Sequence, residues 1–333
     1  LIINGAMQVA QRGTSFTATG SYPVDRFRPQ WGGTDENPTV AQVDVTSGTT
    51  PYTSGFRKAI KITNGNQSSG AGTSDYLFLR YKVEAQDLAQ SGWNYTSASS
   101  FITLSFWVKS SVAQTFQCRL ESQDGTKQNF PFEIGSLSAD TWTKITKTIP
   151  GNSNITINND TGTGMEIWWE LFRGTSNRTK DQTSTWYTTN NATFEITGVQ
   201  FEVGSFATDF EHRSYAQELH RCARYYQKQL SGNPKAVASA FAYNTQYGNF
   251  TPHYPMGPMR TAPSLDQTNG NNYYEINGGL DHGDHLDGAF VIEHGTETTC
   301  NIYFDPDGAL NNGYAFYLRS DNASAYLAYS AEL

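Results

Sequence analysis

The stretch Phe101-Ile102-Thr103-Leu104-Ser105-Phe106-Trp107-Val108-Lys109 alternates between two kinds of side chain. One set of alternate positions is wholly apolar: Ile102, Leu104, Phe106 and Val108. The other set is mostly polar and includes Trp107. A period of two residues is that of a β-strand with one face in a core. The stretch therefore predicts a half-buried strand.

The same alternation recurs through the first part of the chain, in residues 76–83, 115–121, 166–172 and 195–203, with Gly, Ser, Asn and Asp clusters between the runs. The expected inward side chains are Leu77, Leu79, Tyr81, Val83, Phe116, Cys118, Leu120, Ile167, Trp169, Leu171, Val199, Phe201 and Val203. About seven or more such strands in succession predict an antiparallel sandwich of two sheets.

A single convincing helix interrupts this pattern at residues 211–228. Ser214 and Gln217 have the spacing of a capping box, and Gly232 and Pro234 mark the end of the helix. Strand patterns then resume in residues 236–243, 247–254, 273–276, 289–293, 298–304, 313–318 and 325–330. We therefore expect an all-β protein with an N-terminal jelly-roll β-sandwich (1–212), a connecting α-helix (213–232) and a smaller C-terminal β-sandwich domain (233–333).

The helix places four side chains on one stripe of a 3.6-residue repeat: Tyr215, Leu219, Cys222 and Tyr226. This stripe predicts a packing face. It serves either as a connector between the two β bodies or as a seam between subunits. A metal site made of His220 and Cys222 is disfavoured, because residues two apart on a helix do not face each other.

Charge and composition exclude several classes of partner. The formal net charge is -8 and no run of Lys or Arg is present, which argues against nucleic acid. No segment has the roughly 18 consecutive apolar residues of a membrane span, so we expect no membrane insertion. The three cysteines show no CxxC spacing, which predicts buried thiols in a reducing compartment.

Several motifs resemble those of known families. TLSFWVK (103–109), DTWTK (140–144) and ITGVQFEVG (196–204) resemble jelly-roll carbohydrate-binding modules. Others look like bacteriophage tail-fibre and related virion proteins: INGAMQVAQRG (3–13), YPVDRF (22–27), FEHRSY (210–215), RCARYYQK (221–228), MRTAP (259–263) and SAEL (330–333). This second resemblance extends over nearly the whole chain.

The resemblance implies a virion surface protein, either a tail fibre or a capsid appendage, that assembles in the cytoplasm of the host bacterium. It also implies a homotrimer whose partners are other virion proteins and a host surface glycan or envelope protein. The jelly-roll modules often hold a structural calcium ion between their first and last strands. Gln8 and Gly198 stand at the corresponding places here, so the acidic ligands are missing. We therefore expect no cofactor, with a structural calcium ion as the alternative.

A glycan site is predicted from the polar sides of the strands. Trp107 and Trp168 both fall there, and the accompanying side chains, if the strands share a sheet, are Arg119, Glu121, Glu166 and Glu170. Sugar rings stack on aromatic faces while their hydroxyls bond to charged groups. The alternative is that both tryptophans pack under loops or a neighbouring domain.

Five potential metal ligands crowd one loop: Asp281, His282, Asp284, His285 and Asp287. They either bind a divalent ion or remain solvated, and their spacing matches no EF-hand or zinc motif.

We expect no enzymatic activity. Glu166 and Glu170 would stand about 13 Å apart along a strand, beyond the separations that glycosidases use. The function expected is receptor or glycan binding during adsorption. The alternatives are a structural capsid- or tail-decorating adaptor and, third, a polysaccharide depolymerase.

Overall fold

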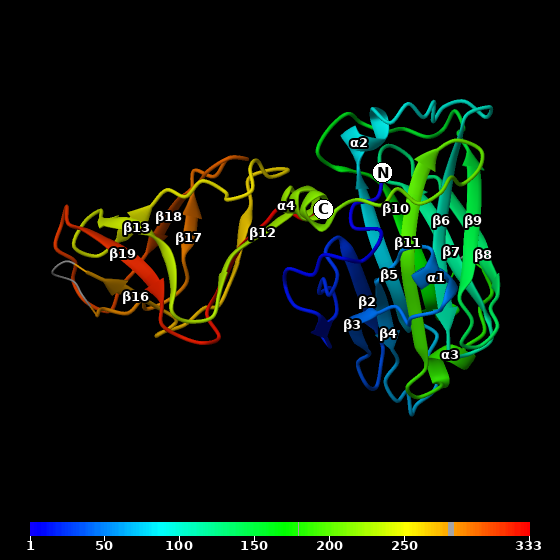
Figure 1. The fold of residues 1–333 in the computed structure, drawn as a ribbon, viewed down its shortest axis with the longest axis horizontal. Helices are drawn as coiled ribbons and strands as arrows, with labels where there is room; N and C mark the ends of the chain where they lie inside the picture. The colour runs from blue at the N-terminus through cyan, green and yellow to red at the C-terminus, as the bar shows by residue number, and fades with distance from the viewer. Residues whose placement is uncertain (179, 279–282) are drawn as a thin grey trace. The chain divides into compact units, whose positions relative to one another are not determined.

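The computed structural model describes residues 1–178, 180–278 and 283–333. The chain divides into two compact units, unit 1 (Leu1–Leu219 with Leu333) and unit 2 (His220–Glu332). Antiparallel strands are the predominant regular secondary structure of each unit (Figure 1), so the predicted all-β class is confirmed. The division falls inside helix α4 (Tyr215–Ala223).

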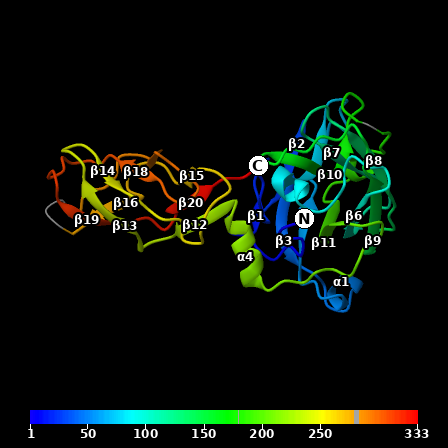
Figure 2. The ribbon, with the colours of Figure 1, turned by 90° about the horizontal axis from the view of Figure 1, so that it is seen from above.

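Unit 1 is a sandwich of two sheets. The first has the order β1 (Ser15–Phe16), β3 (Thr39–Asp44), β4 (Lys58–Thr63), β11 (Thr193–Val203), β6 (Phe101–Ser110) and β9 (Thr143–Pro150). The second has the order β2 (Phe27–Gly32), β5 (Tyr76–Glu84), β10 (Thr163–Arg173), β7 (Thr115–Ser122) and β8 (Asn129–Ser136). Figure 2 shows them as two layers. Three short helices lie in the connections: α1 (Thr50–Thr53), α2 (Ala85–Ala89) and α3 (Thr185–Thr188).

The core of unit 1 lies between these sheets and is built from the inward side chains predicted by the alternation. All of them except Val203 are buried, and the inward residues of β6 are fully buried. Val203 is 40% exposed, because it is the last residue of β11 and the strand ends there. Local periodicity therefore predicted the core, except at the end of this strand.

Asn4 fixes the first loops of unit 1, and Gly5 joins them to its last strand. Asn4 is fully buried with φ of 62°, and its side-chain amide donates to the carbonyls of Val9 (2.9 Å) and Asp25 (3.1 Å). Its Oδ1 accepts from the backbone N–H of Val9 at 2.9 Å. Gly5 accepts from the N–H of Val199 at 2.9 Å, and a Cβ on Gly5 would lie 2.0 Å from the Val199 carbonyl oxygen. Only glycine permits this approach.

Unit 2 also contains two sheets. The small sheet has the order β12 (Tyr226–Ser231), β20 (Tyr326–Ser330) and β15 (Ser264–Gln267). The large sheet has the order β16 (Tyr274–Asn277), β19 (Ala315–Ser320), β13 (Lys235–Ala242), β14 (Gly248–Phe250), β18 (Asn301–Phe304) and β17 (Val291–Glu293). One hydrophobic cluster contains residues of both sheets, among them Leu230, Leu327, Ile302 and Leu318.

The helix is shorter than the sequence predicts. Its capping box is confirmed, since Ser214 and Gln217 exchange hydrogen bonds of 2.9 Å and 3.3 Å. It ends at Ala223, and Tyr226 begins β12 by pairing with Ser330 of β20. Backbone pairing with a distant strand overrides the local helical period here.

The predicted stripe is therefore wrong as a single helix face. Tyr215 is 55% exposed, whereas Cys222 is buried. Leu219 is half-buried, and Tyr226 lies on a strand where its hydroxyl donates to Asp266 of β15 at 2.9 Å. The helix buries Glu218 instead, whose carboxylate accepts from the backbone N–H of Asn4 and from Arg213.

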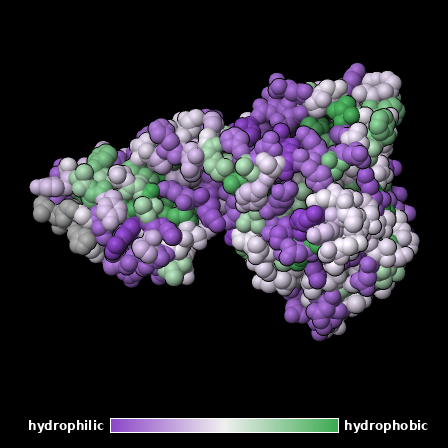
Figure 3. Space-filling model, in the orientation of Figure 1, coloured by the Kyte–Doolittle hydropathy of each residue, from purple (hydrophilic) through white to green (hydrophobic). Residues whose placement is uncertain are grey.

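Within the described residues, no helix is both long enough and apolar enough to cross a membrane. The visible faces of both units carry hydrophilic and hydrophobic residues interspersed (Figure 3). All three cysteines are buried, as predicted.

Replacement of Asn4 by Leu should lower the free energy of unfolding of unit 1 by about 3 kcal/mol or more, because it leaves buried backbone groups of Val9 and Asp25 without partners. All seven tryptophans lie in unit 1, so their fluorescence during urea denaturation reports on this unit alone. The matched control is Asn154→Leu at an exposed position. Equal unfolding curves for the two variants would contradict the role assigned to Asn4.

Candidate functional site

The predicted glycan groove does not form as one surface, because its two tryptophans lie on different sheets. Trp107 is on β6 of the six-stranded sheet, whereas Trp168 is on β10 of the five-stranded sheet. Arg119, Glu121, Glu166 and Glu170 do share the sheet of Trp168, as the prediction required. The two tryptophans must therefore be considered separately.

Trp168 lies at the centre of a cross-strand row. It stands opposite Arg80 of β5 and Arg119 of β7. The guanidinium carbons of Arg80, Arg119 and Arg173 lie 5.1, 4.3 and 5.2 Å from its ring centre, and the ring of Phe78 lies 4.5 Å away. Cations at this distance are attracted by the indole quadrupole.

Three carboxylates complete this layer. Glu166 pairs with Arg80 at 3.4 Å, and Glu121 pairs with Arg119 at 3.0 Å. Glu170 lies 3.2 Å from Nε of Arg119 and 2.7 Å from Nε of Arg173, and its side chain is 2% exposed. Burial raises the pKa of Glu170, and the two arginines only partly oppose this rise.

The Trp168 cluster consists of Trp168, Phe78, Arg80, Arg119, Arg173 and the three carboxylates. Its aromatic ring is surrounded by side chains of the protein itself, and its charges are paired with one another. Trp168 is half-buried, and the guanidinium groups around its ring reduce the area on which a sugar could stack. The alternative that Trp168 serves packing is favoured.

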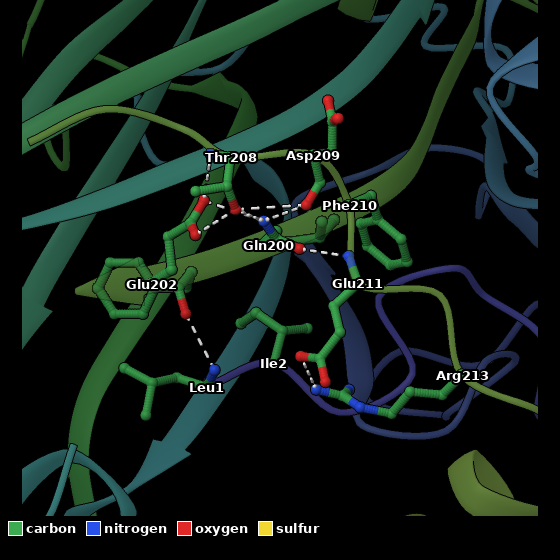
Figure 4. Close-up of a pocket in the computed structure, with 11 residues that line it drawn as sticks. Leu1, Ile2, Gln200, Glu202, Thr208, Asp209, Phe210, Glu211 and Arg213 are labelled. Carbon is green, nitrogen blue, oxygen red and sulfur yellow. Dashed lines mark hydrogen bonds and ion pairs between the residues drawn. The ribbon is translucent and has the colours of Figure 1, made fainter. Parts of the chain in front are cut away.

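The segment 208–210 lines two pockets of unit 1. The first, of about 430 Å³, is drawn in Figure 4. Glu202 accepts from the backbone N–H and the hydroxyl of Thr208 at 2.9 and 2.6 Å, and Gln200 accepts from the N–H of Glu211 at 2.9 Å. Burial raises the pKa of Glu202, but its hydrogen bonds from Thr208 and Gln200 outweigh burial and lower it. Since these polar groups already bind one another, this pocket anchors the segment to β11.

The second pocket, of about 300 Å³, is the Trp107 pocket. Its lining residues are Ser54, Phe56, Ser105, Trp107, Lys144, Gly198, Thr208, Asp209, Phe210 and His212. β6 supplies Ser105 and Trp107, and Lys144 of β9 stands opposite Trp107. Strand pairing therefore places a lysine beside the indole.

One wall of the Trp107 pocket is aromatic. The ring centres of Phe56, Phe210 and His212 lie 4.8 to 5.1 Å from one another. His212 Nε2 is 2.9 Å from the carbonyl oxygen of Ser54. Gly198 has φ of 63° in a bulge of β11, and a Cβ there would lie 2.6 Å from the Phe56 ring. Glycine at this bulge therefore lets the wall close against the sheet.

The polar groups of the Trp107 pocket remain open to a ligand. Lys144 and Asp209 are exposed, and no ion-pair partner is found for either within the described part of the chain. Figure 4 shows the Asp209 carboxylate pointing away from the hydrogen-bonded groups of the first pocket. The alternation placed Trp107 on the polar face, but it gave no signal for Phe56, Phe210 or His212, which come from loops.

The predicted metal loop is only partly described, because Asp281 and His282 lie outside the described residues. His285 Nε2 lies 3.1 Å from Asp321 and 3.8 Å from Glu275. These three are the only group of potential metal ligands in the described ranges, and Asp284 and Asp287 do not belong to it. Arg319 also pairs with Glu275. Its guanidinium group therefore already occupies a position where a metal ion would pair with this carboxylate.

Asp287 has a different partner. Its side chain forms a hydrogen bond with that of Asp307, which raises the pKa of Asp307, and burial and the Asp287 charge add to this rise. Sequence reasoning missed Asp321, which lies far from the loop in sequence, and it missed Glu275, which precedes the loop on β16 and faces His285 across a β-bridge.

No protein-family model and no curated protein sequence matches the chain. Among solved structures, the enzymatically active domain of bacteriophage CBA120 tailspike protein 4 is 9% identical, with a TM-score of 0.35, over 61% of this chain and 21% of that one. The N-terminal cellulose-binding domain of a Cellulomonas fimi β-1,4-glucanase is 11% identical, with a TM-score of 0.31, over 59% of this chain and 97% of that domain. A xylan-binding domain from Paenibacillus barcinonensis is 10% identical, with a TM-score of 0.29, over 58% of this chain and 94% of that domain. Likenesses of this degree identify no family, and function is inferred below from other observations.

Replacement of Arg119 by Ala should lower the free energy of unfolding of unit 1 by about 3 kcal/mol, because it removes a cation from two largely buried carboxylates. Arg178→Ala is the matched control. Its partner Asp181 is 91% exposed, so the change should stay within about 1 kcal/mol. Urea denaturation measures both. An unchanged stability of Arg119→Ala together with lost saccharide binding would instead assign the Trp168 cluster to a ligand.

Proposed function

We propose that unit 1 binds a saccharide in the Trp107 pocket, and that the chain is a bacteriophage virion surface protein of tail-fibre type that uses this binding during adsorption to its host. The observation that supports saccharide binding is one pocket that combines aromatic rings with open polar groups. Trp107 and the aromatic wall offer apolar faces to sugar C–H groups. Lys144, Asp209 and the serine hydroxyls offer donors and acceptors to sugar hydroxyls.

The size of the pocket agrees with this ligand class. A volume of about 300 Å³ is at the lower end of ligand pockets in proteins, which suits one or two sugar units and not a long chain held along its whole length. A site this small binds weakly by itself. Several copies on a homotrimer and on a symmetric particle would raise the overall avidity without any new contact.

The virion role is supported by the sequence motifs that resemble tail-fibre proteins. Asp209 is the sole carboxylate among the described residues that line the Trp107 pocket, whereas glycoside hydrolysis ordinarily uses two. We therefore propose a binding protein and not a depolymerase.

Replacement of Trp107 by Leu should weaken saccharide binding by about tenfold or more, because it removes the stacking surface. The measurement is retention on an array of oligosaccharides and bacterial surface polysaccharides, with affinities from titration of the retained ones. Trp142→Leu is the matched control, since Trp142 packs in the same hydrophobic cluster but does not line the pocket. Thermal unfolding of both variants separates lost binding from lost folding.

Three outcomes would decide against the proposal. Equal loss of binding in the two tryptophan variants would mean that the pocket is not the site. No retention of the wild-type chain on any saccharide or on host cells, with the protein located on the capsid or along the tail, would favour a structural decorating role. Shortening of a retained polysaccharide during incubation would show a depolymerase.

A further inference from the structure

The large sheet of unit 2 turns one face away from the hydrophobic core. Its strands β13, β14, β18 and β17 are neighbours. Phe241 stands opposite Asn249, and Asn249 stands opposite Tyr303. Val291 stands opposite Tyr303 on the other side. Residues directly opposed in antiparallel strands share a face. Phe241 is 47% exposed and Val291 is 55% exposed, so the whole row lies on the solvent face.

The turn between β13 and β14 extends this row with two tyrosines. The N–H of Tyr243 donates to the carbonyl of Tyr247 at 2.9 Å, which sets the two residues opposite each other. Tyr243 is exposed, and its ring meets that of Tyr303 edge-on at 5.8 Å. We call Phe241, Tyr243, Tyr247, Asn249 and Tyr303 the aromatic face. It contains no Asp, Glu, Lys, Arg or His.

Asn249 lies in the middle of the aromatic face, between the strands of Phe241 and Tyr303. It is 6% exposed, and its Oδ1 is buried without a hydrogen-bond partner in the described part of the chain. A buried amide oxygen without a donor costs folding free energy. A ligand that brings a hydroxyl to this position would remove that cost.

We propose that the aromatic face is a second binding site and that its ligand is an uncharged saccharide. Phe241 and Tyr243 stack on the C–H faces of sugar rings, and Asn249 Oδ1 accepts a hydrogen bond from a sugar hydroxyl. None of these five residues is Asp, Glu, Lys, Arg or His, and Glu293 is on the same side of the sheet only at its edge, opposite Asn301. A charged ligand at the centre of the aromatic face would therefore lose its hydration without gaining an ion pair there. An apolar partner would bury Asn249 further and still leave its oxygen without a donor. A saccharide satisfies both requirements, because it presents apolar ring faces and hydroxyls together.

The site is separate from the Trp107 pocket. All of its residues belong to unit 2, whereas the Trp107 pocket is built from unit 1 alone. The inference therefore does not rest on the function proposed for unit 1.

The test uses the full chain carrying Trp107→Leu, so that the pocket of unit 1 does not contribute. The probe is an array of uncharged oligosaccharides of glucose, galactose, mannose and N-acetylglucosamine. Phe241→Ala and Tyr243→Ala should each weaken retention by about tenfold. Tyr314→Ala is the matched control, because Tyr314 is equally exposed at 48% but lies outside the aromatic face, opposite the buried Ala242. It should leave retention unchanged.

The effects of Asn249→Leu on binding and on stability distinguish a ligand-binding residue from a purely structural one. It removes the unpartnered oxygen, so retention should fall while the melting temperature of unit 2 stays the same or rises. Retention should also persist in about 0.5 M salt, because no ion pair holds the ligand.

The proposal is overturned if no uncharged oligosaccharide is retained, or if Tyr314→Ala weakens retention as much as Phe241→Ala does. It is also overturned if salt abolishes retention. Loss of self-association in Phe241→Ala, seen by light scattering without any change in retention, would assign the face to a second copy of this chain.

Discussion

The structure of unit 1 depends on two neighbouring residues: Asn4, whose side chain joins the first loops of the unit, and Gly5, whose backbone contacts the last strand, β11. Asn4 satisfies three backbone groups from two loops with one buried amide. Gly5 lets the backbone approach Val199, immediately after the bulge at Gly198. The same bulge admits the Phe56 ring that forms a wall of the Trp107 pocket. Closure of the sandwich and formation of the pocket therefore both depend on the backbone conformation of the bulge at Gly198 and Val199.

Two tryptophans on outward faces of the same sandwich have opposite surroundings. Trp168 has arginines as its neighbours in register, and their guanidinium groups cover the ring. Trp107 has Thr197 and Lys144 as neighbours in register, and a pocket opens beside it. Side-chain type alone does not assign a binding role. The residues opposite on adjacent strands decide whether a ring packs or remains open.

The two proposed sites differ in their chemistry. The Trp107 pocket carries a lysine and an aspartate without ion-pair partners among the described residues, whereas the five residues of the aromatic face of unit 2 include no Asp, Glu, Lys, Arg or His. Salt should therefore affect the two sites differently, because screening acts on charges and not on stacking. Two weak sites of different character on one chain would discriminate among surface polysaccharides better than either site alone, provided that both bind parts of one polymer.

The sequence by itself determined five strands of unit 1 (β5, β6, β7, β10 and β11), their inward residues except Val203, and the capping box at Ser214, because these features have periods or spacings of a few residues. It determined most strands of unit 2 as well, but it missed β15 and assigned β12 to a helix. Only the tertiary structure decided sheet membership, and with it the separation of Trp107 from Trp168 and the gathering of Glu275, His285 and Asp321. Those outcomes depend on hydrogen bonds between residues far apart in the chain, and a local pattern carries no information about which distant strand will supply them.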